Sequence, residues 1–199
     1  IFTYTGNFTG FINDFVAYGT VNTNLGLLKS DISFKPLENK ALKIEGHLKT
    51  NVLDVGTLLD VKNIGTLTLS GNVDGTLKGN KYDLVINSLI DSIDLNDYCF
   101  HNVVLNGNIR NKLFDGMLTV NDPNLKLDYS GRLDLSPELP VFEFVADVRD
   151  ASLSKLNLSK DTASLVSFEL DANFIGSNID NLKGQIKVKD LKYKNFRDS

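Results

Sequence analysis

Cys99 and His101 are the two residues whose side-chain types and spacing come closest to a reactive site in this chain. A thiol and an imidazole at positions i and i+2 project from the same face of a β-strand, and both groups bind zinc. A structural zinc site needs four ligands, but the chain has no other cysteine, and its second histidine, His47, lies 54 residues away. The pair therefore predicts neighbouring side chains on one strand and no metal site.

Asp91, Asp94 and Asp97 recur at every third position, and their carboxylates are the type of ligand that calcium takes. The segment lacks the central glycine and the terminal glutamate of an EF-hand loop, so solvated turns are favoured instead. The Gly-x-Ser-x-Gly, phosphate-loop and His-Glu-x-x-His motifs do not occur either. We therefore expect a protein that is not an enzyme and that has no catalytic residues, no metal and no cofactor.

The net charge of −4 excludes a strongly basic nucleic-acid-binding protein, so no nucleic-acid partner is expected. Positive charge gathers only near the C-terminal end, where it could contact anionic lipid headgroups. Asp180 and Asp190 interrupt this cluster, and a solvated outer face of the protein is therefore the favoured interpretation. The basic residues concerned are Lys183, Lys187, Lys189, Lys192, Lys194 and Arg197.

The composition indicates which elements position these side chains. The chain has 20 Asp against 5 Glu, 22 Asn against a single Gln, and only 6 Ala in 199 residues. Short polar side chains compete with the helix for backbone hydrogen bonds, and the good helix formers are scarce, which argues against a helical bundle. A hydrophobic fraction of 42% argues against disorder, and the length allows one large domain or two small ones.

Strict alternation of apolar and polar residues dominates the sequence and predicts half-buried β-strands. One example covers residues 67–77, where Leu67, Leu69, Val73 and Leu77 share one face with two glycines, and Thr, Ser, Asn and Asp occupy the other. About a dozen such runs occur, most of them separated by short turn sequences such as residues 121–124. Short connections between alternating strands favour antiparallel meanders with one solvated face.

Glycine is concentrated on the apolar face of these expected strands. Ten of the 15 glycines have an apolar residue two positions before and two positions after them. Glycine inside a strand marks a bend, a bulge or a close approach, so a β-sandwich with bulges and a curved sheet with room for a ligand are both compatible. The glycine pattern alone favours the sandwich. These glycines are Gly6, Gly10, Gly19, Gly46, Gly71, Gly75, Gly107, Gly116, Gly131 and Gly184.

Two segments break the alternation, and each predicts a short helix or a single helical turn that crosses the apolar surface. Val55, Leu58 and Leu59 follow helical spacing, as do Leu153 and Leu156, 98 residues further on. The strand patterns after each crossing correspond as well, which predicts a divergent repeat of about 98 residues and an elongated protein. We expect residues 1–52 to end one repeat, residues 53–150 to form a complete one and residues 151–199 to begin the next, within one continuous unit.

At this point the chain resembles the AsmA-like superfamily, and within it the TamB-type translocation and assembly module proteins of Bacteroidetes-like bacteria. The order and spacing of the matching stretches carry the resemblance, which covers most of the chain and would make this sequence an internal fragment. The stretches are residues 10–19 (GFINDFVAYG), 25–32 (LGLLKSDI), 52–59 (VLDVGTLL), 121–124 (NDPN), 131–135 (GRLDL), 153–158 (LSKLNL) and 178–184 (NIDNLKG).

The resemblance implies an all-β fold: an elongated, strongly curved, mostly antiparallel sheet that forms a taco-like open trough or half-barrel, with one or two short helical crossings. It also implies a periplasmic location in a Gram-negative bacterium, with the full-length protein anchored in the inner membrane. The trough would shield the acyl chains of phospholipids, or other acyl chains, during transport between the inner and outer membranes. An outer-membrane assembly partner is attributed to some members.

The apolar face of the expected strands supplies candidate residues for the lining of a lipid groove. A second function class is a scaffold for outer-membrane protein assembly or secretion that pairs its sheet edges with client strands. A third class, a strand-built outer-membrane or cell-surface domain, is disfavoured because the chain has no tryptophan. The candidate lining residues are Leu67, Leu69, Val73, Leu77, Leu105, Ile109, Leu127, Tyr129, Leu133, Phe144, Phe168 and Leu170.

Overall fold

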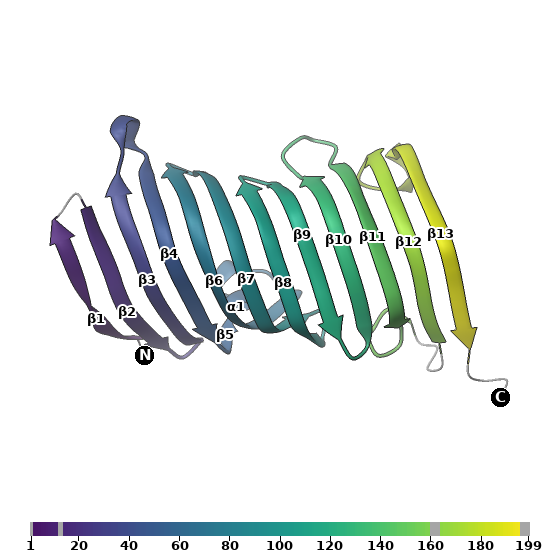
Figure 1. Cartoon of the computed structure of the whole chain (residues 1–199), viewed down its shortest axis with the longest axis horizontal. Helices are drawn as coiled ribbons and strands as arrows, with labels where there is room; N and C mark the ends of the chain where they lie inside the picture. The colour runs from purple at the N-terminus through teal and green to yellow at the C-terminus, as the bar shows by residue number, and fades with distance from the viewer. Residues whose placement is uncertain (1, 12–13, 160–163, 196–199) are drawn as a thin grey trace.

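The structure is a computed structural model that describes residues 2–11, 14–159 and 164–195. Most of these residues belong to one 13-stranded β-sheet. Figure 1 shows the sheet as a long single layer, with the first strands at one end and the last strands at the other.

The elements follow one another along the chain with short connections. The strands are β1 (Phe2–Phe11), β2 (Asp14–Thr23), β3 (Gly26–Pro36), β4 (Leu42–Asn51), β5 (Leu53–Asp54), β6 (Ile64–Lys78), β7 (Lys81–Leu95), β8 (Tyr98–Arg110), β9 (Leu113–Asp122), β10 (Leu125–Asp134), β11 (Val141–Ser152), β12 (Ser164–Ile175) and β13 (Lys183–Asn195). The helices are the α-helix α1 (Val55–Leu59) and the 3-10 helices η1 (Glu38–Lys40) and η2 (Ile179–Asn181).

The sheet is an antiparallel meander in which each strand pairs with the next one in sequence. The order runs β1-β2-β3-β4-β6-β7-β8-β9-β10-β11-β12-β13, and the short β5 also pairs with β6. Within the described residues the order does not return on itself, so the sheet stays open. The turns predicted from Asn-, Asp- and Gly-rich segments permit only such local antiparallel pairing. The expected all-β, mostly antiparallel, curved architecture is therefore confirmed.

Strand register collects the apolar residues on one side of the sheet. The row that begins at Val73 on β6 continues through Ile86, Gly107, Gly116 and Gly131 on the next four strands. Because side chains alternate along every strand, the neighbouring rows two residues away carry the remaining apolar residues on the same side. We call this side the concave face and the opposite side the convex face.

The convex face is polar and solvated. Opposite charges pair across neighbouring strands there: the Nε of Arg110 lies 2.9 Å from an Asp83 oxygen, and Lys43 pairs with Asp74. Ion pairs this exposed contribute little to stability, but they keep this face hydrated. The sheet therefore separates a wet surface from an apolar one by a single layer of backbone.

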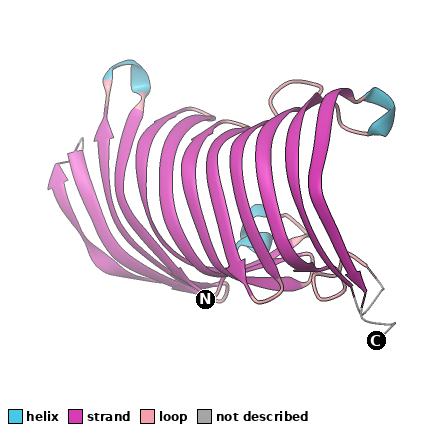
Figure 2. Cartoon of the chain, turned by 45° about the vertical axis from the view of Figure 1, so that its right-hand side comes forward, coloured by secondary structure: helices cyan, strands magenta, loops and turns pink. Residues whose placement is uncertain are grey.

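Bulges bend the strands around the concave face. On β11 the register shifts between Val148 and Ala151, and Asp150 takes a φ of +50°; on β13 Asp190 takes the same φ beside a second register shift. A bulge kinks its strand and strengthens the local twist. Figure 2 shows the outcome, a sheet bowed into an open trough. The sandwich that the glycine pattern alone favoured is not formed by the described residues, because the bends curve one sheet instead of stacking two.

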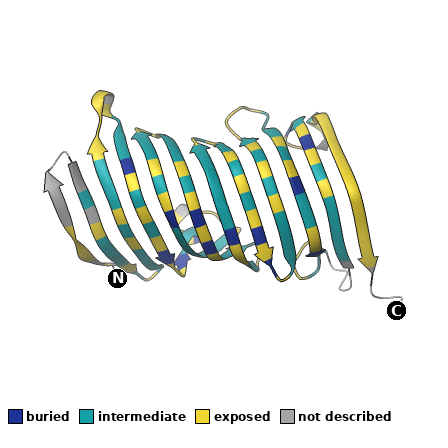
Figure 3. Cartoon of the chain, viewed as in Figure 1, coloured by how far each residue is buried: buried dark blue, intermediate teal, exposed yellow. Residues whose placement is uncertain are grey.

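Few side chains are fully buried in this arrangement. The accessible surface is 13,005 Å², whereas a compact monomer of this mass exposes about 9,300 Å². A buried cluster lies on β7, β8 and β9, where Ile90, Val103 and Val120 pack together. Figure 3 shows the buried positions scattered among intermediate and exposed ones. Within the described part, no second layer covers the concave face, although an apolar sheet face ordinarily packs on one.

Two short crossings interrupt the meander, as the sequence predicted. The first contains α1, whose N-cap is Asp54: its Oδ1 accepts from the Thr57 backbone N at 2.9 Å. The second, residues 153–159, consists of turns and buries Leu156. Each crossing begins with a similar backbone hydrogen bond, from Asp54 N to Leu25 O and from Ser152 N to Asn124 O. The division of the chain into repeats of about 98 residues stays a prediction.

Candidate functional site

An apolar hollow of about 390 Å³ on the concave face spans four successive strands, β8 to β11. All seven side chains that line it are hydrocarbon except for the hydroxyl of one tyrosine. We call this cavity the aromatic groove. It is lined by Leu105, Phe114, Leu118, Tyr129, Leu133, Phe142 and Phe144.

Glycines beneath the aromatic groove let its rings lie flat on the sheet. A Cβ on Gly107 would come within 2.7 Å of the Phe114 ring, and one on Gly131, whose φ is +152°, would come within 2.5 Å of the Phe144 Cβ. The rings occupy the volume that these missing side chains leave. Tyr129 lies between Phe114 and Phe144, with ring centroids 6.3 and 5.2 Å away. The result is a broad aromatic surface that stays open toward the trough.

A second apolar hollow of about 410 Å³ lies further toward the N-terminal end of the trough. Val21 and Leu28 of the concave face line it together with Leu53 and with Leu58 of α1. Leu58 remains 59% exposed, so α1 borders the trough without closing it. Apolar surface therefore recurs along the trough, beyond the aromatic groove itself.

All twelve predicted lining residues lie on the concave face. Four of them line the aromatic groove: Leu105, Tyr129, Leu133 and Phe144. Three pack against the buried cluster of Ile90, Val103 and Val120: Leu67, Leu69 and Leu127. The remaining five are placed there by strand register: Val73, Leu77, Ile109, Phe168 and Leu170. Their contact with lipid stays a prediction.

Phe114, Leu118 and Phe142 line the aromatic groove but were missed from the sequence. Both faces of β9 carry apolar residues, because Leu113 and Met117 point to the convex face. Alternation therefore did not distinguish the residues that face the groove. A usable signal existed, because Gly116 belongs to the glycines flanked by apolar residues at −2 and +2, and these two neighbours are Phe114 and Leu118. Phe142 shares its alternating run with Phe144.

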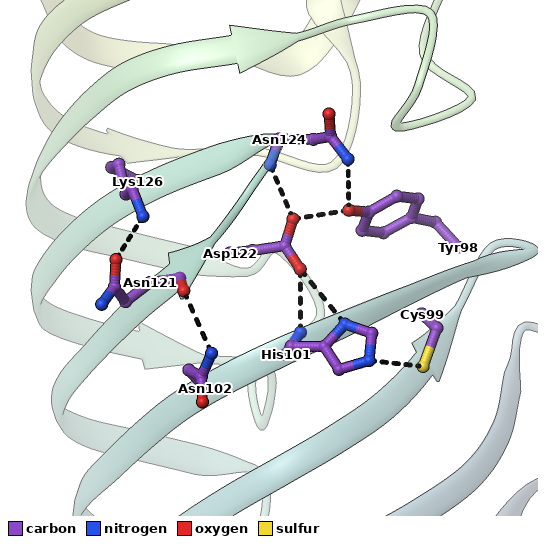
Figure 4. A network of polar contacts seen from close by, with 8 residues as sticks. All are labelled: Tyr98, Cys99, His101, Asn102, Asn121, Asp122, Asn124 and Lys126. Carbon is purple, nitrogen blue, oxygen red and sulfur yellow. Dashed lines mark hydrogen bonds and ion pairs between the residues drawn. The ribbon is translucent and has the colours of Figure 1, made fainter.

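The Cys99–His101 pair belongs to a polar network at the rim of the trough (Figure 4). The Sγ of Cys99 lies 3.9 Å from His101 Nε2, which confirms that the two residues share a face. On the other side of the ring, Nδ1 lies 3.5 Å from a carboxylate oxygen of Asp122, whose side chain is fully buried. That carboxylate also accepts hydrogen bonds from the Tyr98 hydroxyl at 2.5 Å and from the backbone N of Asn124 at 2.8 Å.

The electrostatics of this network hold Cys99 as a neutral thiol. Its hydrogen bond to Asp94, together with burial, raises the pKa of the Cys99 thiol to about 11. A nucleophilic cysteine needs the opposite shift. Asp94 in turn accepts from Thr66 N and Oγ1, at 3.1 and 2.7 Å. Asp94 therefore lies within β7 and joins it to β6, and the solvated turn expected there is wrong for this residue.

Among the residues that the structure describes, no group of three or more histidine, cysteine or carboxylate side chains is placed to hold a metal ion. His47 lies on the convex face, far along the sheet from Cys99, and its ring is bound between Asn72 and Ser70 at 2.9 Å each.

The raised thiol pKa predicts slow alkylation of Cys99. At pH 8 the native chain is expected to react with iodoacetamide about a hundredfold more slowly than the urea-unfolded chain, because little thiolate is present. Asp94→Asn removes the charged acceptor and is expected to speed the native reaction. Alkylation rates between pH 7 and pH 10 measure this. Equal rates for the native and unfolded wild-type chain would contradict the assignment.

The lysines near the C-terminal end lie on the edge strand β13. Lys187 faces Asp171 and Lys189 faces Glu169 on β12, so acidic residues accompany the positive charge. All the β13 residues whose burial is described are exposed, as expected for a solvated face. Arg197, which was counted with this cluster, lies outside the described residues.

Comparison with known proteins finds no match to this chain among family models, curated proteins or solved structures. In the described part of the chain, no helix has the length and apolar character that a membrane span requires. What the aromatic groove can do must therefore follow from its own geometry and chemistry.

Proposed function

We propose that this chain is a non-enzymatic segment of a periplasmic bridge protein that shields lipid acyl chains during transport between the inner and outer membranes. The observation that supports this proposal is the concave face, which is apolar along its length and lacks a covering layer within the described residues. An apolar sheet face of this size ordinarily needs a partner. A hydrocarbon chain fits the shape and the chemistry of an open trough.

The driving force is hydrophobic. Each CH₂ group removed from water is worth about 0.8 kcal/mol, so a long acyl chain prefers the aromatic groove strongly over solvent. The headgroup stays hydrated at the open side of the trough, and none of the described residues that line the groove carries a charge that would oppose the chain. The protein thus lowers the cost of moving a lipid through water without any covalent chemistry.

The dimensions favour a passage over a single binding pocket. Twelve strands lie in one row, and neighbouring strands are separated by about 4.8 Å, so the trough extends for about 50 Å across the strands. This exceeds the thickness of a bilayer's hydrocarbon core, about 30 Å. Anchoring in the inner membrane and contact with an outer-membrane partner belong to the same proposal and concern the full-length protein.

Lipid content tests the proposal directly. The chain, expressed in the periplasm of a Gram-negative bacterium and purified without detergent, is expected to carry phospholipid that native mass spectrometry and solvent extraction detect. Chain stripped of lipid is expected to take up phospholipid again from vesicles. A chain that is folded, lipid-free and unable to bind phospholipid from vesicles would refute the proposal.

The edge strands support a second candidate function, a scaffold that pairs with the strands of unfolded outer-membrane proteins. β13 is the last strand of the row, and its residues are exposed wherever burial is described. An exposed edge is a template for strand addition, although its five lysines also discourage pairing. The two functions differ in their dependence on the groove: client binding should survive a charge placed in the aromatic groove, whereas lipid binding should not.

A further inference from the structure

Among the described residues that line the aromatic groove, only Tyr129 carries a polar side-chain atom. Its hydroxyl makes no hydrogen bond within the described part of the chain, although the ring contacts Phe114 and Phe144. We propose that the Tyr129 hydroxyl donates a hydrogen bond to the acyl carbonyl oxygen of the bound molecule, so that the groove selects fatty acids and acyl esters over plain hydrocarbons. This inference rests on the proposed function and adds a specificity-determining residue to it.

Two buried hydroxyl groups of the concave face, those of Thr50 and Ser88, have partners within the sheet. Thr50 Oγ1 donates to the carbonyl oxygen of Leu67 at 2.9 Å and accepts from the backbone N of Leu69 at 3.0 Å. Ser88 Oγ donates to a backbone carbonyl oxygen at 3.4 Å. These two buried hydroxyls form hydrogen bonds with backbone groups of neighbouring strands. Tyr129 stands in contrast, because its hydroxyl is placed among hydrocarbon side chains without an acceptor.

The surroundings of Tyr129 hold the ring in place. Phe114 stacks on one side at 6.3 Å and Phe144 on the other at 5.2 Å. Strand pairing puts Leu118 and Ala146 next to Tyr129 on the neighbouring strands. A ring fixed in this way loses little conformational freedom on binding, which favours a directional hydrogen bond to a ligand.

The protonation state of Tyr129 suits a donor. Burial, and to a lesser degree the negative charge of Asp115, raises the pKa of the Tyr129 hydroxyl above its ordinary value near 10. The hydroxyl therefore stays protonated at neutral pH and can only donate to, and never repel, a carbonyl or carboxylate oxygen. An acyl carbonyl oxygen supplies the acceptor that the described side chains around this hydroxyl lack.

The test compares three probes of equal chain length: palmitic acid, methyl palmitate and hexadecane. Binding to the full chain is measured by native mass spectrometry at graded probe concentrations, for wild type and for Tyr129→Phe, which keeps the ring. The variant is expected to lose about three- to tenfold in affinity for the two carbonyl probes, the usual worth of one hydrogen bond, and nothing for hexadecane. Tyr18→Phe, on the convex face, is the matched control and should bind all three probes as wild type does.

The outcomes separate this inference from the proposed function. A loss with both carbonyl probes supports acyl esters and acids as ligands, and a loss with palmitic acid alone supports free fatty acids. Equal affinities of Tyr129→Phe and wild type for the carbonyl probes, or an equal loss for hexadecane, would overturn the role of Tyr129. A wild-type chain that binds none of the three probes refutes the acyl-chain groove itself.

Discussion

Phe144→Asp is expected to abolish lipid binding, whereas Val145→Asp on the same strand is expected to leave it intact. Phe144 lines the aromatic groove and Val145, which is 54% exposed, points to the convex face. A carboxylate in the groove must either lose its hydration or draw water in beside the acyl chain, and both outcomes oppose the chain. The same charge on the convex face stays hydrated and touches no lipid.

The measurement is the molar ratio of extracted phospholipid to protein after purification without detergent. We expect this ratio to fall by about tenfold or more for Phe144→Asp and to remain at the wild-type value for Val145→Asp. Circular dichroism establishes that each variant keeps its β-sheet. If Phe144→Asp does not fold, Leu133→Asn places a neutral polar group in the same groove and carries the same expectation. Equal lipid content in folded groove and convex-face variants would contradict the proposed groove.

Asp122→Ala is expected to lower the free energy of unfolding by about 2–5 kcal/mol at pH 7. The side chain is fully buried and accepts from the Tyr98 hydroxyl and from the backbone N of His101 and of Asn124. Its removal leaves these three donors without their acceptor. They lie at one rim of the trough, near the β7–β8 and β9–β10 turns. Urea unfolding followed by circular dichroism measures the change.

Asp128→Ala provides the matched control for this substitution. Asp128 lies on the convex face, half exposed, in ion pairing with Arg149. Removal of such an exposed pair costs about 0–1 kcal/mol. A loss for Asp122→Ala no larger than that for Asp128→Ala would show that the polar network does not support the rim.

The pH dependence of the same variant follows from its pKa. Burial by itself raises the pKa of Asp122, but the hydrogen bonds from Tyr98, Asn124 and His101 outweigh it and hold the pKa below its ordinary value. The carboxylate therefore contributes its stabilisation above the unfolded value of about 3.9, and this contribution disappears as the pH falls through the folded pKa. The difference in unfolding free energy between wild type and Asp122→Ala is expected to narrow as the pH falls below the unfolded pKa of about 3.9.

The rim of the trough is built from such polar contacts, and they leave the concave face free. Asn157 of the second crossing donates from its Nδ2 to the carbonyl oxygens of Asn96, at 3.3 Å, and of Asp97, at 3.1 Å. This contact joins the β11–β12 connection to the β7–β8 turn, about 60 residues away in sequence. Stability at the rim therefore does not require the apolar side chains to pack on one another, which is compatible with an open groove.

The sequence predicted the faces of the sheet better than it predicted the groove. Alternation assigned Leu69, Leu105 and Phe144 to the concave face correctly, because a strand exposes every second residue to the same side. It missed Phe114 and Asp122, the acidic partner of His101. Phe114 lies on a strand that has apolar residues on both of its faces. Asp122 reaches His101 only because strand pairing brings β8 and β9 together. Neither relation is visible in local spacing.

By itself, then, the sequence determined a meander of antiparallel strands, one apolar and one polar face, and glycines on the apolar side, since all of these depend on interactions between residues close in the chain. Only the tertiary structure decided whether the apolar face packs on a second layer or remains open. That choice depends on bends such as those at Asp150 and Asp190, which accumulate over many strands and curve one sheet into a trough. The physical reason is that the curvature of the sheet adds up the bends of all its strands, whereas the apolar–polar alternation depends only on residues close together in the chain.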